Sequence, residues 1–173
     1  MDLKKYIRDI PDFPKKGILF HDITTLFKNR LAMNYVLDCF CDRYERENIE
    51  FIIAMEARGF ILGGALADRL KCGFVPIRKP GKLPAKTISE TYFLEYGSDS
   101  VEIHADAISE GNRVLIVDDL VATGGTLLAG VKLAGRLGAN ITGVAAIIDM
   151  PDLGGRALLK EYNYFYLIEY IGK

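Results

Sequence analysis

The stretch VLIVDDLVATGGT, Val114 to Thr126, carries the strand and the loop that decide the fold. Its four leading apolar residues show no polar alternation, which is typical of a strand buried on both faces in a parallel sheet. Asp118 and Asp119 follow that strand, and small residues then open a helix. Ligands of doubly wound sheets bind beyond the carboxyl ends of the strands. We therefore expect a binding site at this end of the strand.

The small-residue loop, residues 122–126, suits a phosphate monoester. Its backbone N–H groups, its two threonine hydroxyls and the positive end of the following helix all favour an anion. The loop has neither the lysine of a nucleoside-triphosphate P-loop nor a GxGxxG dinucleotide fingerprint. The preceding carboxylates can accept hydrogen bonds from hydroxyls. Either feature alone is common at ordinary strand ends, but together they favour a sugar phosphate.

The same strand, turn and helix order occurs earlier in the chain, as FIIAM (51–55), EARG (56–59) and FILGGALADRL (60–70). Apolar runs without alternation also predict strands at 74–77, 141–149 and 164–170, and a helix is expected at 126–137. This pattern predicts an α/β, doubly wound fold with a mainly parallel central sheet. Segments 90–96 and 100–106 instead predict an antiparallel hairpin around Gly97.

The remaining segments are expected to be helices and loops. Leu3, Tyr6, Ile7 and Ile10 recur at helical spacing and predict a short helix before Pro11. A longer helix is expected to follow from about residue 33 to residue 48. Residues 78–89, RKPGKLPAKTIS, have no apolar period and predict a mobile loop.

The length of 173 residues favours one domain with one sizeable core. The 22 basic and 23 acidic residues give a net charge of -1, so composition offers no reason to expect nucleic acid or a membrane as partner. The apolar runs are too short to span a bilayer, and MDLKKYIRDI lacks a signal-peptide core, so we expect a cytoplasmic protein. Three cysteines without CxxC spacing indicate reduced, mostly buried thiols.

The 114–126 stretch resembles the phosphoribosyl pyrophosphate signature of type I phosphoribosyltransferases. PDFPKKGILFHDIT (11–24), EARGF (56–60), IRKPGKLP (77–84), LEYG (94–97) and YFYLIEY (164–170) are similar to the adenine-using branch, in the same order. The resemblance implies the type I phosphoribosyltransferase fold as a single domain, 1–173. A small N-terminal hood (about 1–33), a core (about 34–173) and a flexible lid loop (about 78–94) would make up that domain.

The implied reaction joins adenine to 5-phosphoribosyl 1-pyrophosphate, giving AMP and pyrophosphate through an oxocarbenium-like transition state. By this resemblance, Asp118 and Asp119 bind the ribose hydroxyls. The 5′-phosphate-binding residues would be Ala122, Thr123, Gly124, Gly125 and Thr126. Glu56, Ala57 and Arg58 would form the pyrophosphate loop.

The resemblance also assigns residues to the lid and to the base. Arg78, Lys79 and Lys82 would neutralise pyrophosphate, with Arg58 and Lys82 counted as catalytic. Glu95 would move the proton at purine N7, and Tyr96 would order the lid. The adenine-binding residues would be Leu19, Phe20 and His21, although the family more commonly has arginine at position 21.

Mg²⁺ is implied as cofactor, held by substrate and water without a direct protein ligand. The expected partners are adenine and phosphoribosyl pyrophosphate, and a homodimer follows from the resemblance alone. Two alternatives remain at this point. One is a xanthine- or guanine-using phosphoribosyltransferase, which commonly needs a lysine near the purine. The other is a non-catalytic regulator that binds ribose phosphates and usually carries an added nucleic-acid-binding element or basic surface.

Overall fold

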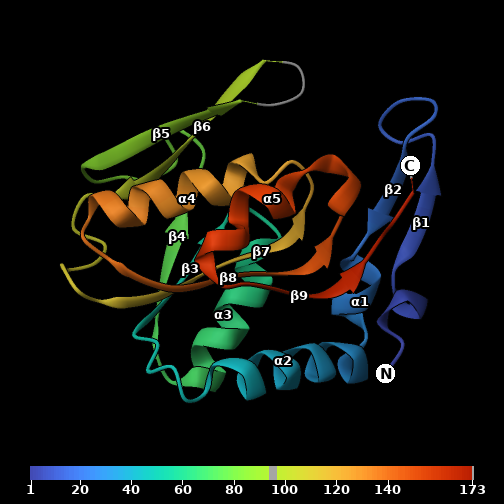
Figure 1. The fold of residues 1–173 in the computed structure, drawn as a ribbon, viewed down its shortest axis with the longest axis horizontal. Helices are drawn as coiled ribbons and strands as arrows, with labels where there is room; N and C mark the ends of the chain where they lie inside the picture. Colours follow the sequence, from blue (N-terminus) through green and yellow to red (C-terminus); the bar gives the residue numbers. More distant parts are fainter. Residues whose placement is uncertain (94–96, 173) are drawn as a thin grey trace.

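A computed structural model describes residues 1–93 and 97–172. Its central sheet has five parallel strands in the order β4-β3-β7-β8-β9 (Figure 1). The bounds of these strands are β3 (Phe51–Met55), β4 (Gly73–Ile77), β7 (Arg113–Val121), β8 (Asn140–Asp149) and β9 (Tyr164–Glu169). The predicted α/β, doubly wound fold with a mainly parallel sheet is confirmed.

Helices cover both faces of this sheet, as unalternating strands require. Helices α2 (Arg30–Tyr44) and α3 (Gly59–Leu70) lie on one face, and α4 (Gly125–Arg136) and α5 (Gly155–Leu159) lie on the other (Figure 1). Each face has its own apolar core. Short 3₁₀ turns, η2 (Pro151–Leu153) and η3 (Lys160–Tyr162), flank α5. Because the five strands are parallel, their carboxyl ends all lie at the same end of the sheet.

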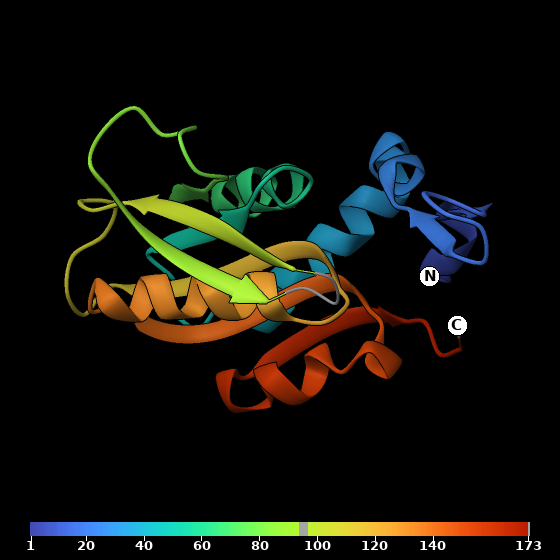
Figure 2. The ribbon, with the colours of Figure 1, turned by 90° about the horizontal axis from the view of Figure 1, so that it is seen from above.

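The N-terminal segment differs from the predicted helix over residues 3–10. Only Leu3–Tyr6 form a 3₁₀ turn (η1), and β1 (Arg8–Pro11) pairs antiparallel with β2 (Leu19–Asp22). The helical spacing was misleading because Ile10 pairs with Phe20, so pairing with a distant segment decides the local structure. This small sheet lies beyond the carboxyl ends of β8 and β9 (Figures 1 and 2).

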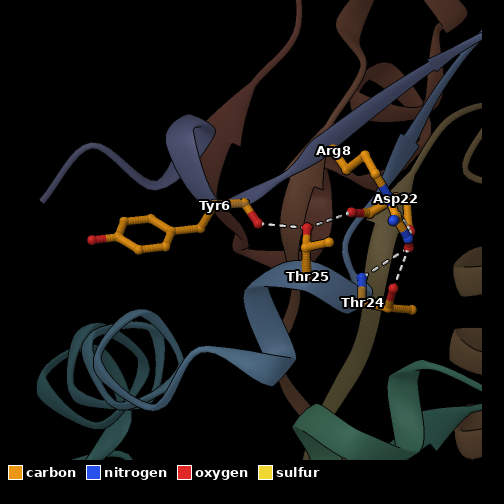
Figure 3. A network of polar contacts seen from close by, with 5 residues as sticks. All are labelled: Tyr6, Arg8, Asp22, Thr24 and Thr25. Carbon is orange, nitrogen blue, oxygen red and sulfur yellow. Dashed lines mark hydrogen bonds and ion pairs between the residues drawn. The ribbon is translucent and has the colours of Figure 1, made fainter.

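Asp22 ties this small sheet to α1 (Thr24–Lys28), as Figure 3 shows. Its carboxylate accepts from the Thr24 hydroxyl at 2.6 Å and from Arg8 Nη2 at 2.5 Å. These contacts lower the pKa of Asp22 to about 2, and the hydrogen bond from the Thr24 hydroxyl has the largest effect. Thr25 Oγ1 donates to the carbonyl of Tyr6 at 2.7 Å. The hood is therefore fastened by polar contacts as well as by its strands.

Strands β5 (Thr87–Phe93) and β6 (Ser98–His104) form the predicted antiparallel hairpin. The loop predicted for residues 78–89 is therefore shorter, 78–86, because residues 87–89 belong to β5. Residues 87–93 of the expected lid, 78–94, likewise form this strand. Ile88 pairs with Ile103, which packs fully buried beside α4. Within residues 1–93 and 97–172, none of the helices combines the length and the apolar character that crossing a membrane requires.

Candidate active site

Asp118 and Asp119 lie in the second half of β7, which continues to Val121. The sequence pattern predicted that the strand would end before them, but Leu120 and Val121 pair with β8. Asp118 is half-buried, and Asp119 is 4% exposed. A Cβ on Gly59 would lie 2.8 Å from Asp118 Oδ1, so only glycine lets α3 begin this close to β7.

Arg58 joins the turn after β3 to the end of β7. Its Nε donates to Asp119 Oδ2 at 2.5 Å, and its side chain is 46% exposed. The Glu56–Ala57 peptide bond in the same turn is cis. The structure thus brings the predicted pyrophosphate loop beside the predicted ribose carboxylates.

Burial and the neighbouring carboxylate of Asp119 raise the pKa of Asp118 well above its usual range. The backbone N–H of Asp119 donates to Asp118 Oδ1 at 2.8 Å, which partly opposes this effect. The site therefore holds a carboxylate whose charge costs folding free energy and which is available to face a developing cation.

We expect Asp118→Asn to be more thermostable than the parent at about pH 8. The raised pKa means that the folded state binds more protons than the unfolded state, so the ionised carboxylate destabilises the fold at pH values above its unfolded pKa. Asparagine keeps an oxygen for the Asp119 N–H and carries no charge. Tm measured across pH should show the gain shrinking toward about pH 4. A variant less stable than the parent at every pH would contradict the charge effect.

The predicted phosphate loop connects β7 to α4. Gly124 has φ +79°, and a Cβ there would lie 2.8 Å from Gly155 Cα. The N–H of Gly155 donates to the carbonyl of Ala122 at 3.0 Å. The loop is therefore supported from behind by the start of α5, and its conformation requires glycine at position 124.

Glu56 fixes the start of the predicted lid. Its two carboxylate oxygens accept from Arg78 Nε and Nη2, both at 3.1 Å, and the Lys79 N–H donates to it at 2.9 Å. The bond from Arg78 lowers the pKa of Glu56. Lys79 Nζ contacts Asp99 and donates to Tyr92 Oη at 3.1 Å. Lys82 lies further along this loop, where its carbonyl accepts from Arg78 Nη1 at 3.2 Å.

Leu19, Phe20 and His21 all lie on β2. Leu19 is 43% exposed, and the Phe20 ring packs edge-on to Phe13 at 5.1 Å. His21 is buried instead: its Nδ1 lies 2.7 Å from Asp9 Oδ1, and its ring stacks on Tyr170. Histidine at this position thus fastens β2 to the C-terminal segment.

Glu95 and Tyr96 lie outside the described residues, so their roles stay predictions. Among the described residues, no three His, Cys, Asp or Glu side chains group as metal ligands. Sequence reasoning missed Gly155, Arg156 and Asp149, which lie behind the phosphate loop. The GG pair at 154–155 and the acid that ends the apolar run 141–149 were visible signals. Only the tertiary structure connects them to the loop.

Comparison with known proteins agrees with this arrangement. Residues 26–171 match the phosphoribosyl transferase domain family. An adenine phosphoribosyltransferase of Brachyspira hyodysenteriae is 52% identical, covering 98% of this chain and 100% of that relative. The crystal structure of the adenine phosphoribosyltransferase from Thermoanaerobacter pseudethanolicus superposes with a TM-score of 0.93 at 50% identity, covering 98% of each chain.

A more distant solved structure carries ligands. It is the Saccharomyces cerevisiae adenine phosphoribosyltransferase complexed with D-2,5-dideoxy-2,5-imino-altritol 1,6-bisphosphate and adenine, with a TM-score of 0.90 at 39% identity and 96% of each chain covered. The chain thus matches these proteins over nearly its whole length, in sequence and in structure. It also has the carboxylates of β7, the small-residue loop and the turn of Arg58 described above. The chain therefore belongs to the phosphoribosyltransferase family and, within it, to the adenine phosphoribosyltransferases.

Proposed function

We propose that the chain transfers the phosphoribosyl group of 5-phosphoribosyl 1-pyrophosphate to adenine, forming AMP and pyrophosphate in purine salvage. The observation that carries this is the juxtaposition at the carboxyl end of β7, where two carboxylates precede a loop of small residues at the start of α4. Asp118 and Asp119 bind the ribose hydroxyls, and residues 122–126 bind the 5′-phosphate. The carboxylates also stabilise positive charge that develops on the ribose.

Arg58 acts on the leaving pyrophosphate. Its contact with Asp119 holds the guanidinium between the ribose site and the cis turn, and half of its side chain stays open to a ligand. Ala57 contributes its backbone beside it. The positive charge of Arg58 stabilises the negative charge that builds on the pyrophosphate as the bond between ribose C1 and the pyrophosphate oxygen breaks.

Arg78, Lys79 and Lys82 bring further positive charge from the loop after β4. Arg78 pairs with Glu56 and Lys79 contacts Asp99, so both cations are held at the base of the loop. Glu56 supports this loop through its side chain in addition to the predicted contact with substrate. Closure of such a loop keeps water away from an oxocarbenium-like transition state.

Mg²⁺ is the proposed cofactor. The side chains at this edge offer oxygen ligands, which Mg²⁺ prefers. Asp119 and Glu56 already accept from Arg58 and Arg78, so an ion at this site would be held mainly by the substrates and water, as the resemblance implies. When bound, Mg²⁺ neutralises charge on the leaving pyrophosphate.

The hood supplies the base site through Leu19, Phe20 and the backbone at His21. An exposed leucine and a phenylalanine ring suit the apolar faces of a purine. Because His21 turns inward to Asp9 and Tyr170, its side chain acts on the hood position and not on the base. The yeast relative's bound adenine supports a base site in this fold.

We further propose a cytoplasmic homodimer. The homodimer extends the family resemblance, in which lid cations often act across the subunit interface. The cytoplasmic location is supported by three free thiols, which persist in a reducing compartment. Cys39, Cys41 and Cys72 are half-buried, less enclosed than the sequence pattern predicted.

A purine panel tests the base assignment. With phosphoribosyl pyrophosphate and Mg²⁺, adenine should exceed hypoxanthine, guanine and xanthine in kcat/KM by about 100-fold or more, because a site that pairs with an exocyclic amine leaves buried groups unpaired against a 6-oxo purine. Comparable turnover of a 6-oxo purine would overturn the assignment of adenine as the base, while the assigned reaction class would stand. No turnover of any purine would favour the non-catalytic regulator.

A further inference from the structure

Arg156, near the start of α5, joins the ends of two strands beside the phosphate loop. Its Nε donates to Asp149 Oδ2 at 2.8 Å, and its Nη2 donates to Glu169 Oε2 at 2.6 Å. Asp149 ends β8 and Glu169 ends β9, so one guanidinium joins α5 to the carboxyl ends of both strands. The site described above uses none of these three side chains.

Asp149 lies buried at the centre of this anchor, whereas the side chains of Arg156 and Glu169 are partly exposed. The Asp149 side chain is 0% exposed, and Tyr164 Oη donates to its second oxygen at 2.9 Å. Tyr166 Oη donates to Glu169 Oε2 at 3.0 Å. The hydrogen bonds of Arg156 to Glu169 and, second, to Asp149 raise the pKa of Arg156. The bond from Arg156 in turn lowers the pKa of Glu169. The guanidinium of Arg156 is thus held by carboxylates from two different strands, which fixes its position.

The residue before Arg156 contacts the phosphate loop directly. The Gly155 N–H donates to the Ala122 carbonyl at 3.0 Å. A Cβ on Gly155 would lie 2.4 Å from that carbonyl oxygen and 2.7 Å from the Gly124 nitrogen. No room exists for the two segments to approach further, so the loop follows the start of α5 when that start moves.

We propose that Arg156 is a positioning residue for the donor's 5′-phosphate: the Asp149–Arg156–Glu169 anchor holds Gly155, and Gly155 holds the backbone of Ala122 to Gly124 in the conformation that binds phosphate. The inference rests on the proposed assignment of residues 122–126. Arg156 acts through Gly155 and without a contact to substrate.

Arg156→Gln tests the proposal, with Arg113→Gln as the matched control. Arg113 is the first residue of β7, at the end of the sheet opposite the proposed site, and it pairs with Glu47. Its side chain is 36% exposed, compared with 37% for Arg156. We expect Arg156→Gln to raise the KM and Kd for phosphoribosyl pyrophosphate by about 3- to 30-fold. The KM for adenine and kcat at saturating donor should stay close to the parent, and Arg113→Gln should change neither KM.

Two further variants keep the test decisive if the lone buried Asp149 charge prevents folding. Asp149→Asn with Arg156→Gln removes both charges and retains an amide pair, and it should show the same donor-specific loss. Arg156→Lys should recover part of the donor affinity because it keeps the charge. Folded variants with a lower Tm that still bind the donor as tightly as the parent would overturn the positioning role.

Thr123→Val separates this failure from failure of the site assignment. The substitution removes a hydroxyl donor from the loop itself and should weaken donor binding whatever Arg156 does. If Thr123→Val weakens donor binding and the Arg156 variants do not, only the positioning role is overturned. If Thr123→Val leaves donor binding unchanged, the phosphate-loop assignment is overturned, and the inference with it.

Discussion

Glu95→Gln is expected to lower kcat by about 10²–10⁴-fold, the usual contribution of a positioned general acid or base. Glutamine keeps the shape of the side chain but cannot move the proton at purine N7. The KM for the donor should change little, because the residues proposed to bind the ribose and its phosphate, Asp118, Asp119 and the 122–126 loop, are unchanged. Steady-state rates at saturating substrates, together with a pH profile that loses one limb, measure the effect.

The matched control is Glu90→Gln, which makes the same change of side chain on β5. Glu90 lies on β5 and pairs with Lys132 and Arg136 on α4, away from the proposed base site. Its replacement disturbs the hairpin without touching proton transfer, so kcat should stay near that of the parent. A folded Glu95→Gln enzyme with parental kcat, where chemistry limits turnover, would make Glu95 a bystander.

Gly124→Val is expected to weaken donor binding by about 100-fold or more, since each hydrogen bond to a charged group contributes about 1.5–3 kcal/mol and the displaced loop would lose more than one. At φ +79° a β-branched residue is strained, and its Cβ would lie 2.8 Å from the Gly155 backbone. The loop must move to relieve that contact, and its N–H groups then leave the positions proposed to bind the phosphate. Calorimetric titration with phosphoribosyl pyrophosphate measures the loss.

Gly111→Val controls for backbone strain alone. Gly111 has φ +83°, and a Cβ there would meet nothing within 4 Å. The residue precedes β7, at the end of the sheet opposite the proposed site. Both variants should lose stability, but only Gly124→Val should lose donor affinity. Equal donor affinity in the two folded variants would contradict the phosphate-loop assignment.

The central sheet could be predicted because burial on both faces leaves a direct mark in the sequence. The runs at 51–55 and 114–117 contain no polar residue, and both form central parallel strands. The order of strand, turn and helix then places Arg58 and Asp119 at one edge. Their contact at 2.5 Å follows from the topology that the pattern already contains.

The remaining errors occur where distant segments decide local structure. The helical spacing of residues 3–10 predicts a helix, but residues 8–11 form a strand because 19–22 offer an antiparallel partner. Residues 87–89 look irregular but pair with 102–104. The anchor of Arg156 joins the ends of two strands, and no local spacing relates them. Side-chain networks of this kind become visible only when the chain is folded.

The most direct measurement is product analysis by ³¹P NMR of the parent enzyme with adenine, phosphoribosyl pyrophosphate and Mg²⁺. We expect equal amounts of AMP and pyrophosphate, formed together as donor and adenine disappear, with the rate falling strongly in Gly124→Val and not in Gly111→Val. Donor that stays intact beside adenine, or donor hydrolysed to ribose 5-phosphate without AMP, would contradict the proposed transfer.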